Sequence, residues 1–318
     1  MHLLILGWSS IVRRRVLPAA RSCTRILRIS VASRTRAAGE MPPGVTWHQD
    51  YEEALSSSGA DLVYVSGVNA VHGTWVTRAL ERGAHVIVDK PAFLDVASAE
   101  AAVALARRVG KGLGEATVFA FHPQMSALQS LLAPGDLAST RVTACLSIPP
   151  LPREDFRYRR DCGGGSLYDL GPYVAATNRL VFGAAPATVE CAVLSVAGTP
   201  AVDTSFSVLL THREGGALTG HCGFVTAYQN RLSVLSRSLA IDVERIFSTP
   251  PDLACTLRVR EQDRDRSVPV PAADAFAQFL EAFCDAVHDL DFTAFESALL
   301  EDARLVARLR QAAGQSQG

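Results

Sequence analysis

The sequence lacks the marks of a secreted or membrane-spanning protein. Its seven cysteines are odd in number, scattered between Cys23 and Cys284 and never paired as C-x-x-C, which argues against a disulfide framework and a zinc site. The first apolar run, His2 to Gly7, is too short for the core of a signal peptide. No run reaches the length of a membrane span. We therefore expect reduced thiols, no metal and a cytoplasmic protein.

An excess of charge of one sign is also missing. The 31 Lys and Arg residues balance 32 Asp and Glu residues, for a formal net charge of -1. Nothing in this balance suggests nucleic acid or an anionic membrane as a partner. What is present is an ordinary globular composition, 48% hydrophobic and 20% charged, in 318 residues. That length is enough for two domains.

Strands alternate with helices over the first 120 residues. We expect strands at 2–7, 25–33, 61–66, 85–90 and 116–121, and helices at 11–21, 51–57, 72–82 and 97–109. This alternation predicts a doubly wound parallel sheet. We assign residues 1–122 to a nucleotide-binding domain.

The strand from His85 to Lys90 ends abruptly in Asp89-Lys90-Pro91. Its apolar β-branched residues predict a buried strand. Pro91 cannot donate to a sheet and drives Lys90 towards an extended backbone. A lysine is thus held at the carboxyl end of a strand, where open α/β sheets bind their ligands. An ordinary lysine in a solvated loop explains the spacing equally well.

The first strand ends in a glycine turn, where such sheets hold a dinucleotide pyrophosphate against a helix N-terminus. In Gly7-Trp8-Ser9-Ser10-Ile11-Val12, only the first glycine of the G-x-G-x-x-G fingerprint remains. Ser9 would tolerate the approach or add a hydroxyl donor, and Val12 makes helix packing bulkier. A bound dinucleotide is expected to contact Gly7, Ser9, Ser10 and Ile11. A strand, turn and helix without a ligand explain the motif nearly as well.

The second strand ends in Ser33-Arg34-Thr35-Arg36, without an acidic residue. NAD enzymes usually hold the ribose hydroxyls with an acid at this place, whereas hydroxyls and guanidinium groups suit a 2′-phosphate. NADP(H) is therefore favoured over NAD(H), with Ser33 and Arg34 as contacts. The alternative is a solvated basic loop.

Strands dominate after residue 142, in alternating patterns that indicate an antiparallel sheet with one solvated or interface-forming face. We expect strands at 143–148, 188–196, 205–210, 217–224, 231–234, 239–243, 256–260 and 267–270, and helices at 168–182, 273–288 and 292–313. Residues 123–318 are assigned to an α+β domain for substrate binding and oligomerisation. Because an open sheet face usually needs covering, we expect a homodimer or homotetramer.

A glycine-rich segment, Asp161 to Tyr173, carries the chemical signal of this half. Its three glycines allow close approach of a ligand. The helix that follows presents Asp169 and Tyr173 four residues apart on one face. A tyrosine beside a lysine is a workable proton donor for a carbonyl, because a nearby ammonium lowers the pKa of the phenol. Alternatively, Asp169 caps the helix and Tyr173 is a half-buried core residue.

Together these segments resemble the Gfo/Idh/MocA family, the glucose–fructose oxidoreductase and inositol dehydrogenase group. Ala84 to Pro91 is similar to the family's G-K-H-V-x-x-E-K-P strand, Val68 to His72 to its P-N-x-x-H turn, and Glu115 to Gln124 to the strand that leaves the nucleotide domain. Gly163 to Tyr173 resembles G-G-G-x-L-x-D-x-G-x-[HY], and Tyr228-Gln229-Asn230 resembles a Y-x-N segment of sugar-active members.

The resemblance implies a Rossmann domain, a substrate domain with a large open sheet, and hydride transfer at C4 of a nicotinamide. It implies that Lys90 polarises a carbonyl or alcohol, that Tyr173 is the general acid/base, and that Asp169 orients the substrate or the lysine. The expected reaction reduces or oxidises a sugar, a polyol or a nucleotide-linked keto sugar with NADP(H). Further cofactor contacts are implied at Asn69, His72, Asp89 and Lys90. The implied substrate pocket contains Lys90, His122, Arg157, Tyr158, Asp169, Tyr173 and Tyr228.

Four residues depart from the family pattern. Ser9 and Val12 replace small residues, Asp89 shortens a glutamate, and Ala176 stands where many members carry Asp or Asn facing the substrate. The substrate is therefore expected to differ from a simple sugar or inositol. Two alternatives stay open, a redox-neutral enzyme with a recycled cofactor and a non-catalytic dinucleotide-binding regulator. Retention of both Lys90 and Tyr173 argues against the regulator.

Overall fold

The computed structural model describes residues 1–33, 42–132, 134–183, 185–195 and 202–315. These residues form two compact units. One contains residues 1–116 and 276–300, and the other contains residues 117–275 and 301–318. The first unit thus takes in a late stretch of chain that a single boundary at residue 122 does not describe, and that boundary stays a prediction.

The first unit is built on a six-stranded parallel sheet in the order β3-β2-β1-β4-β5-β6. The strands are β1 His2–Leu6, β2 Arg28–Ala32, β3 Val45–His48, β4 Leu62–Val65, β5 His85–Val88 and β6 Leu113–Glu115. The helices are α1 Leu17–Ser22, α2 Tyr51–Ser57, α3 His72–Glu81, α4 Val96–Val109 and most of α7 Ala275–Asp289. The strand order reverses between β1 and β4, and open α/β sheets bind ligands beyond the carboxyl ends of the strands at such a reversal.

Most predicted elements of this unit are confirmed, with one correction. The prediction of a strand at 116–121 is wrong. The last strand of the sheet is β6, which pairs with β5 through Val86 and Leu113. Residues Val118–Phe121 form a 3-10 turn instead, and Phe119 is buried in the core of the second unit. A short apolar run is buried in either conformation, so its composition does not distinguish them. The expected helix at 11–21 begins as a π-helical segment, Val12–Val16, before α1.

The second unit contains an eight-stranded sheet in the order β14-β13-β12-β11-β7-β10-β9-β8. Neighbouring strands are antiparallel except for the parallel pair β7 and β10, which confirms the mostly antiparallel prediction. The strands are β7 Arg141–Ser147, β8 Thr188–Leu194, β9 Ser205–Thr211, β10 Ala217–Gly223, β11 Gln229–Leu235, β12 Leu239–Glu244, β13 Cys255–Glu261 and β14 Arg264–Val270.

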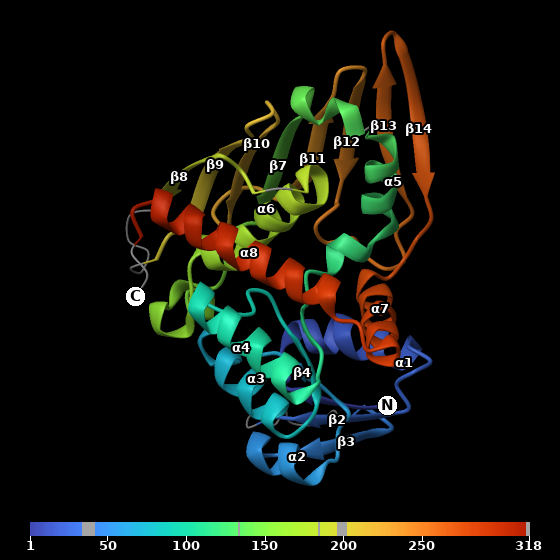
Figure 1. The fold of residues 1–318 in the computed structure, drawn as a ribbon, viewed down its shortest axis with the longest axis vertical. Coiled ribbons are helices and arrows are strands. Elements are labelled where there is room, and N and C mark those ends of the chain that lie inside the picture. The colour runs from blue at the N-terminus through green and yellow to red at the C-terminus, as the bar shows by residue number, and fades with distance from the viewer. Residues whose placement is uncertain (34–41, 133, 184, 196–201, 316–318) are drawn as a thin grey trace. The chain divides into compact units, whose positions relative to one another are not determined.

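Helices cover one face of this sheet (Figure 1). Helix α6, Ser166–Phe182, packs against β9 and β10, and α5, Pro123–Leu131, packs against β13 and β14. Helix α8, Thr293–Ala312, ends in this unit, where Arg179 of α6 pairs with its Asp302 at 2.8 Å. Helix α5 was not predicted from the sequence. In the described part of the chain, no helix has both the length and the apolar character needed to cross a membrane.

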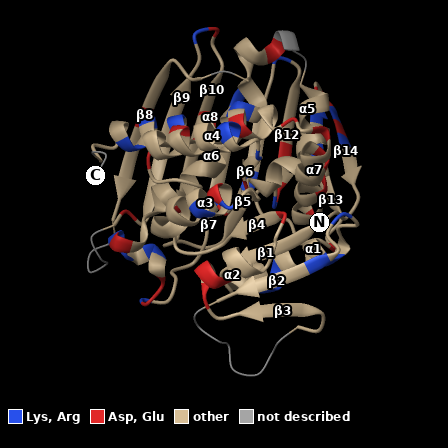
Figure 2. Cartoon of the chain, turned by 60° about the horizontal axis from the view of Figure 1, so that its bottom comes forward, with Lys and Arg blue, Asp and Glu red and all other residues tan. Residues whose placement is uncertain are grey.

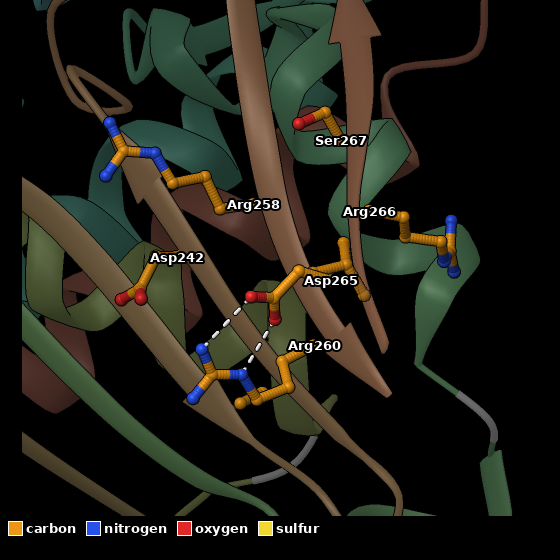
Figure 3. A pocket seen from close by; sticks show the side chains of 8 residues that line it. Asp242, Arg258, Arg260, Asp265, Arg266 and Ser267 are labelled. Carbon is orange, nitrogen blue, oxygen red and sulfur yellow. Dashed lines mark hydrogen bonds and ion pairs between the residues drawn. The ribbon is translucent and has the colours of Figure 1, made fainter. Parts of the chain in front are cut away.

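The opposite face of this sheet carries charged side chains of both signs on β11 to β14. Arg264, Asp265 and Arg266 follow one another along β14 (Figure 2), and because successive side chains of a strand point to opposite faces, Asp265 is the one that lies on this face, opposite Arg260. A shallow hollow lies over β12, β13 and β14 (Figure 3). There Arg260 donates to Asp265 through Nε at 2.7 Å and through a terminal nitrogen at 3.2 Å. This face is open to solvent, and beside its charged groups it exposes Leu194, Leu209 and Leu235.

Candidate functional site

One group of candidate site residues lies in the first unit, at the strand ends where the order reverses. Gly7 follows β1 with a φ of +113°. A Cβ at this position would lie 1.6 Å from the backbone oxygen of Ser66, which follows β4. Only glycine fits this close approach of two chain segments. The predicted tight turn is present, and its glycine is required by the protein's own packing.

The turn leads into a helix whose first amides precede the intrahelical bonds. The first backbone bond of the helix runs from Arg13 N to Ser9 O at 3.1 Å, so the amides of Ser10 and Ile11 lie before the hydrogen-bonded ladder. Amides in this position satisfy a phosphate in dinucleotide-binding folds. The Ser9 hydroxyl accepts from Val12 N at 3.1 Å and lies 3.0 Å from the Ser66 hydroxyl.

The second strand end is described only in part. Ser33 is buried directly after β2, and its amide donates to His48 O of β3 at 3.1 Å. Arg34, Thr35 and Arg36 lie outside the described residues, so the basic half of the predicted 2′-phosphate contact stays a prediction. Beside this strand end, the rings of Trp8 and Trp47 meet edge to face at 5.8 Å.

Asp89 and Lys90 follow β5, as the sequence predicted. Both Asp89 oxygens accept hydrogen bonds from β4 and its continuation, one from the Tyr64 hydroxyl at 2.5 Å and one from the Ser66 hydroxyl at 2.6 Å. Lys90 is half-buried. The loop after it is fixed from β6, because Ala92 N donates to Glu115 Oε2 at 2.8 Å.

Asn69 begins a 3-10 turn, Asn69–Val71, and His72 is the first residue of α3, and both are buried. His72 has no exposed surface, and its two ring nitrogens face backbone oxygens, Nδ1 the Pro91 carbonyl at 2.8 Å and Nε2 the Gly67 carbonyl at 3.3 Å. Burial lowers the pKa of His72 against the opposing effect of Asp89. Its ring thus links the residue after Lys90 to Gly67, which lies just beyond β4.

Another group of candidate residues lies in the second unit, on α6. The predicted glycine turn is present. The close approach that its glycines allow is made by another segment of the protein's own backbone. A Cβ on Gly164 would lie 2.5 Å from Arg157 O. Gly165, at the N-cap of α6, has no side chain to cap the helix. Asp203 caps it instead, with Oδ2 accepting from the Ser166 hydroxyl at 2.5 Å and from Leu167 N at 2.7 Å.

Asp169 and Tyr173 lie one turn apart on α6, as predicted. Asp169 is buried and accepts from Arg157 Nε at 2.9 Å, and Arg157 also contacts Asp155 at 3.3 Å. Burial by itself would lower the pKa of Arg157, but the two carboxylates raise it above its ordinary value. The structure therefore brings the predicted residues Arg157 and Asp169 together as an ion pair.

The ring of Tyr173 is held by two phenylalanines. Phe119 lies 5.6 Å from it between ring centroids and Phe247 also 5.6 Å, while the two phenylalanines lie 5.3 Å apart. Such offset and edge-to-face contacts fix the plane of an aromatic ring. Asn230 in turn holds Phe247, because its Oδ1 accepts from Phe247 N at 3.0 Å. The phenol of a half-buried tyrosine is thus oriented by packing.

The remaining predicted residues divide between core and surface. His122 is buried and caps α5, where its Nδ1 accepts from Gln124 N at 3.2 Å. Tyr158 is buried against Phe224, and Ala176 is fully buried in the hydrophobic core. The ring of Tyr228 is 44% exposed, and the guanidinium of Arg245 stacks over it at 5.5 Å. Of this group, Tyr228 is the one that reaches solvent.

Sequence reasoning missed the residues that hold the site. Tyr64 and Ser66 anchor Asp89, Asp203 caps α6, and Phe247 packs on Tyr173. The glycine at the N-cap was a usable signal, because a helix start without a capping side chain must find its partner elsewhere. The sequence did not indicate which residue supplies it.

Comparison with known proteins matches both halves of the chain. The model described as an oxidoreductase family with an NAD-binding Rossmann fold matches residues 1–117, and the GFO/IDH/MocA C-terminal domain matches residues 127–238. A dTDP-3,4-didehydro-2,6-dideoxy-alpha-D-glucose 3-reductase of Actinomadura kijaniata is 32% identical over 293 residues, 89% of this chain and 86% of that protein. A D-xylose 1-dehydrogenase (NADP(+)) of Haloferax volcanii is 28% identical over 290 residues, 89% and 88% of the two chains.

A solved structure is also closely similar. A 3-ketoreductase from Actinomadura kijaniata, in complex with NADP and TDP-benzene, superimposes with a TM-score of 0.92 and 29% identity, covering 98% of this chain and 97% of that one. That enzyme has also been solved with a tyrosine changed to phenylalanine and with a lysine changed to alanine.

Proposed function

We propose, since the chain belongs to the GFO/IDH/MocA oxidoreductase family, that it reduces the keto group of a nucleotide-linked sugar with NADPH. The likeness to a 3-ketoreductase that holds NADP and TDP-benzene, over nearly the whole of both chains, carries this proposal. The strand-end lysine and the helix with Asp169 and Tyr173 supply the chemistry that such a reduction needs.

The residues of the first unit fit a dinucleotide. The glycine turn at Gly7 brings two chain segments together at the strand-order reversal, and the amides of Ser10 and Ile11 lie before the helix ladder. These groups would hold the pyrophosphate, and Ser33 with Arg34 would hold the 2′-phosphate that distinguishes NADPH from NADH. The bound nicotinamide supplies the hydride.

Lys90 and Tyr173 have separate roles in this proposal. The ammonium of Lys90 stabilises the negative charge that develops on the substrate oxygen. The Tyr173 hydroxyl gives that oxygen its proton, and the contacts with Phe119 and Phe247 keep the phenol in one orientation. The Arg157–Asp169 pair fixes the Asp169 carboxylate, which orients the substrate. In the opposite direction, the same groups oxidise an alcohol.

The test starts with fluorescence titrations of the purified protein with NADPH and with NADH. NADPH should bind more tightly. Turnover is then followed by the loss of NADPH absorbance with a dTDP-linked keto sugar. Lys90→Ala and Tyr173→Phe should each lower turnover by about a hundredfold or more while NADPH binding is retained. Lys111→Arg and Tyr51→Phe serve as matched controls and should retain wild-type turnover.

The outcomes separate the remaining alternatives. NADPH binding without turnover of any keto sugar or alcohol would favour the dinucleotide-binding regulator. Conversion of a substrate without net loss of NADPH would favour the redox-neutral enzyme. Failure to bind either dinucleotide would refute the redox proposal.

Assembly and location form part of the same proposal. The open face of the eight-stranded sheet is the surface through which we expect a homodimer or homotetramer, and sedimentation at micromolar concentration should show a mass above that of one chain. All seven cysteines are free, which favours a reducing compartment such as the cytoplasm. Cell fractionation tests that location.

A further inference from the structure

A chain of hydroxyl groups links the first strand turn to the residue before Lys90. The Ser9 hydroxyl lies 3.0 Å from the Ser66 hydroxyl, which lies 2.6 Å from Asp89 Oδ2. The other oxygen of Asp89 meets the Tyr64 hydroxyl at 2.5 Å. These residues follow β1, β4 and β5 or belong to them, so the chain crosses the strand-order reversal.

The direction of each hydrogen bond follows from the chemistry of the groups. An ionised carboxylate only accepts, so Ser66 and Tyr64 both donate to Asp89. Because the Ser66 hydroxyl gives its hydrogen to Asp89, its oxygen accepts in the contact with Ser9, and the Ser9 hydroxyl is the donor. The Ser9 oxygen accepts in turn from Val12 N at 3.1 Å. The Ser9 hydrogen is therefore directed to Ser66 inside the protein, so of the two expected roles of Ser9 this arrangement favours tolerance of a close approach over donation to a pyrophosphate.

Burial makes these bonds persistent. Tyr64 is fully buried and Ser66 nearly so. Burial first, and the Asp89 carboxylate second, raise the pKa of Tyr64 well above its ordinary value, so the phenol keeps its hydrogen and stays a donor. A buried donor that loses its acceptor destabilises the folded protein. The hydrogen bonds from Tyr64 and Ser66 therefore keep the Asp89 carboxylate in place.

A second clamp holds the residue after the lysine. The two ring nitrogens of His72 face carbonyl oxygens, and a neutral imidazole has a single hydrogen to donate. The shorter contact, 2.8 Å from Nδ1 to Pro91 O against 3.3 Å from Nε2 to Gly67 O, places that hydrogen on Nδ1. Lys90 thus stands between two neighbours that are each fixed by buried groups.

We propose that Ser9, Tyr64 and Ser66 are positioning residues for Lys90, acting through the Asp89 carboxylate while His72 holds Pro91 on the other side. This inference rests on the proposed function of Lys90. The proposal also connects two departures from the family pattern, Ser9 and Asp89. Ser9, at the second glycine position, begins the chain of hydrogen bonds that ends on Asp89, the residue before Lys90. Ser9 then serves the lysine, and the dinucleotide meets the backbone amides.

The kinetic test uses the full chain with NADPH and a dTDP-linked keto sugar. Ser66→Ala and Tyr64→Phe should each lower kcat by about tenfold, with the Kd for NADPH changed by less than about twofold. Ser66→Thr keeps the hydroxyl and should restore kcat. Ser30→Ala is the matched control, since Ser30 is an equally buried hydroxyl of the same sheet that pairs with His2, and it should leave kcat unchanged.

A double-mutant cycle tests the serial order of the chain. Once Ser66 is removed, Ser9 has no connection to Asp89. Ser9→Ala should therefore lower kcat by about threefold in the wild type and by almost nothing in the Ser66→Ala background. If the two substitutions lower kcat independently of each other, the proposed serial order of the hydrogen bonds is refuted.

Lys90 can also be observed without turnover. The chain has two lysines, Lys90 and Lys111, so reductive methylation with carbon-labelled formaldehyde gives two side-chain signals in an NMR spectrum, and Lys111→Arg assigns them. The Lys90 signal should shift and broaden in Ser66→Ala and Tyr64→Phe, and stay as in the wild type in Ser66→Thr and Ser30→Ala. A Lys90 signal identical in all variants would overturn the proposal. Absence of wild-type turnover would count against the proposed function alone, because the NMR result stands without it.

Discussion

Removal of the Asp203 carboxylate should loosen the start of the helix that carries Asp169 and Tyr173. Asp203 is buried, and its Oδ2 accepts from the Ser166 hydroxyl and from Leu167 N. A hydrogen bond to a charged group contributes about 1.5–3 kcal/mol. In Asp203→Ala both donors lose their acceptor, so we expect a loss of about 3–5 kcal/mol in the free energy of unfolding.

The loss should be visible by thermal unfolding and by hydrogen exchange. For a unit of this size, each kcal/mol lowers Tm by about 2–4 °C, so Asp203→Ala should lower it by roughly 10 °C. Asp203→Asn keeps the shape and one acceptor and should lose about half as much. The exchange of backbone amides at residues 166–169 should accelerate in both variants, because these amides start α6.

A surface acid just before α6 provides the control. Asp161 pairs with Arg159 at 2.6 Å, and both side chains are exposed. Exposed ion pairs contribute little, so Asp161→Ala should leave Tm and amide exchange unchanged. If Asp203→Ala unfolds within about 2 °C of the wild type, or if exchange at the start of α6 does not change, the assignment of Asp203 as the cap is refuted.

Two other perturbations follow from buried rings. Burial lowers the pKa of His85 to about 4, and its Nδ1 accepts from Gly112 N. An unfolded histidine titrates near pH 6.5. The contribution of neutral His85 to the free energy of unfolding should therefore be complete above about pH 6.5 and should be lost as the pH falls towards 4, by about 3 kcal/mol at most. Urea unfolding of His85→Gln should show a weaker acid dependence, and an unchanged dependence would contradict the assignment. Phe247→Leu removes one of the two aromatic rings that pack on Tyr173, so kcat should fall by about tenfold at unchanged NADPH affinity. A wild-type kcat would show that the ring contact does not orient the phenol.

Local patterns were sufficient for the strands that position the lysine. β1, β4 and β5 are continuous apolar runs because both faces of a parallel sheet are covered, and their limits agree with the predicted strands within about two residues. β3 was missed because it is a short edge strand of four residues, Val45–His48, that is only partly buried. α5 was missed because its first residue, Pro123, was taken with the preceding apolar run as part of a strand.

The candidate site was predictable only to the extent that its residues are neighbours in the sequence. Lys90 at a strand end and the pair Asp169 and Tyr173 on one helix face were found because strand and helix periodicity place them. Their supports come from distant parts of the chain. Ser66 lies 23 residues from Asp89 and Asp203 lies 36 residues from Leu167. Such contacts depend on sheet register and helix packing, which residue spacing does not determine.

The degenerate glycine fingerprint gives slight support to a protein that binds a dinucleotide without turnover. The structure weakens that argument. Gly7 is required by the backbone of Ser66, Ser9 is accommodated by two hydrogen bonds, and Val12 is fully buried. The turn is therefore well packed with the residues it has, and the amides that would meet a phosphate do not depend on a second glycine. What distinguishes a ketoreductase from a regulator is then the chemistry of Lys90 and Tyr173, since a regulator gains nothing from a lysine whose two neighbours are held by buried groups or from a phenol packed against two aromatic rings.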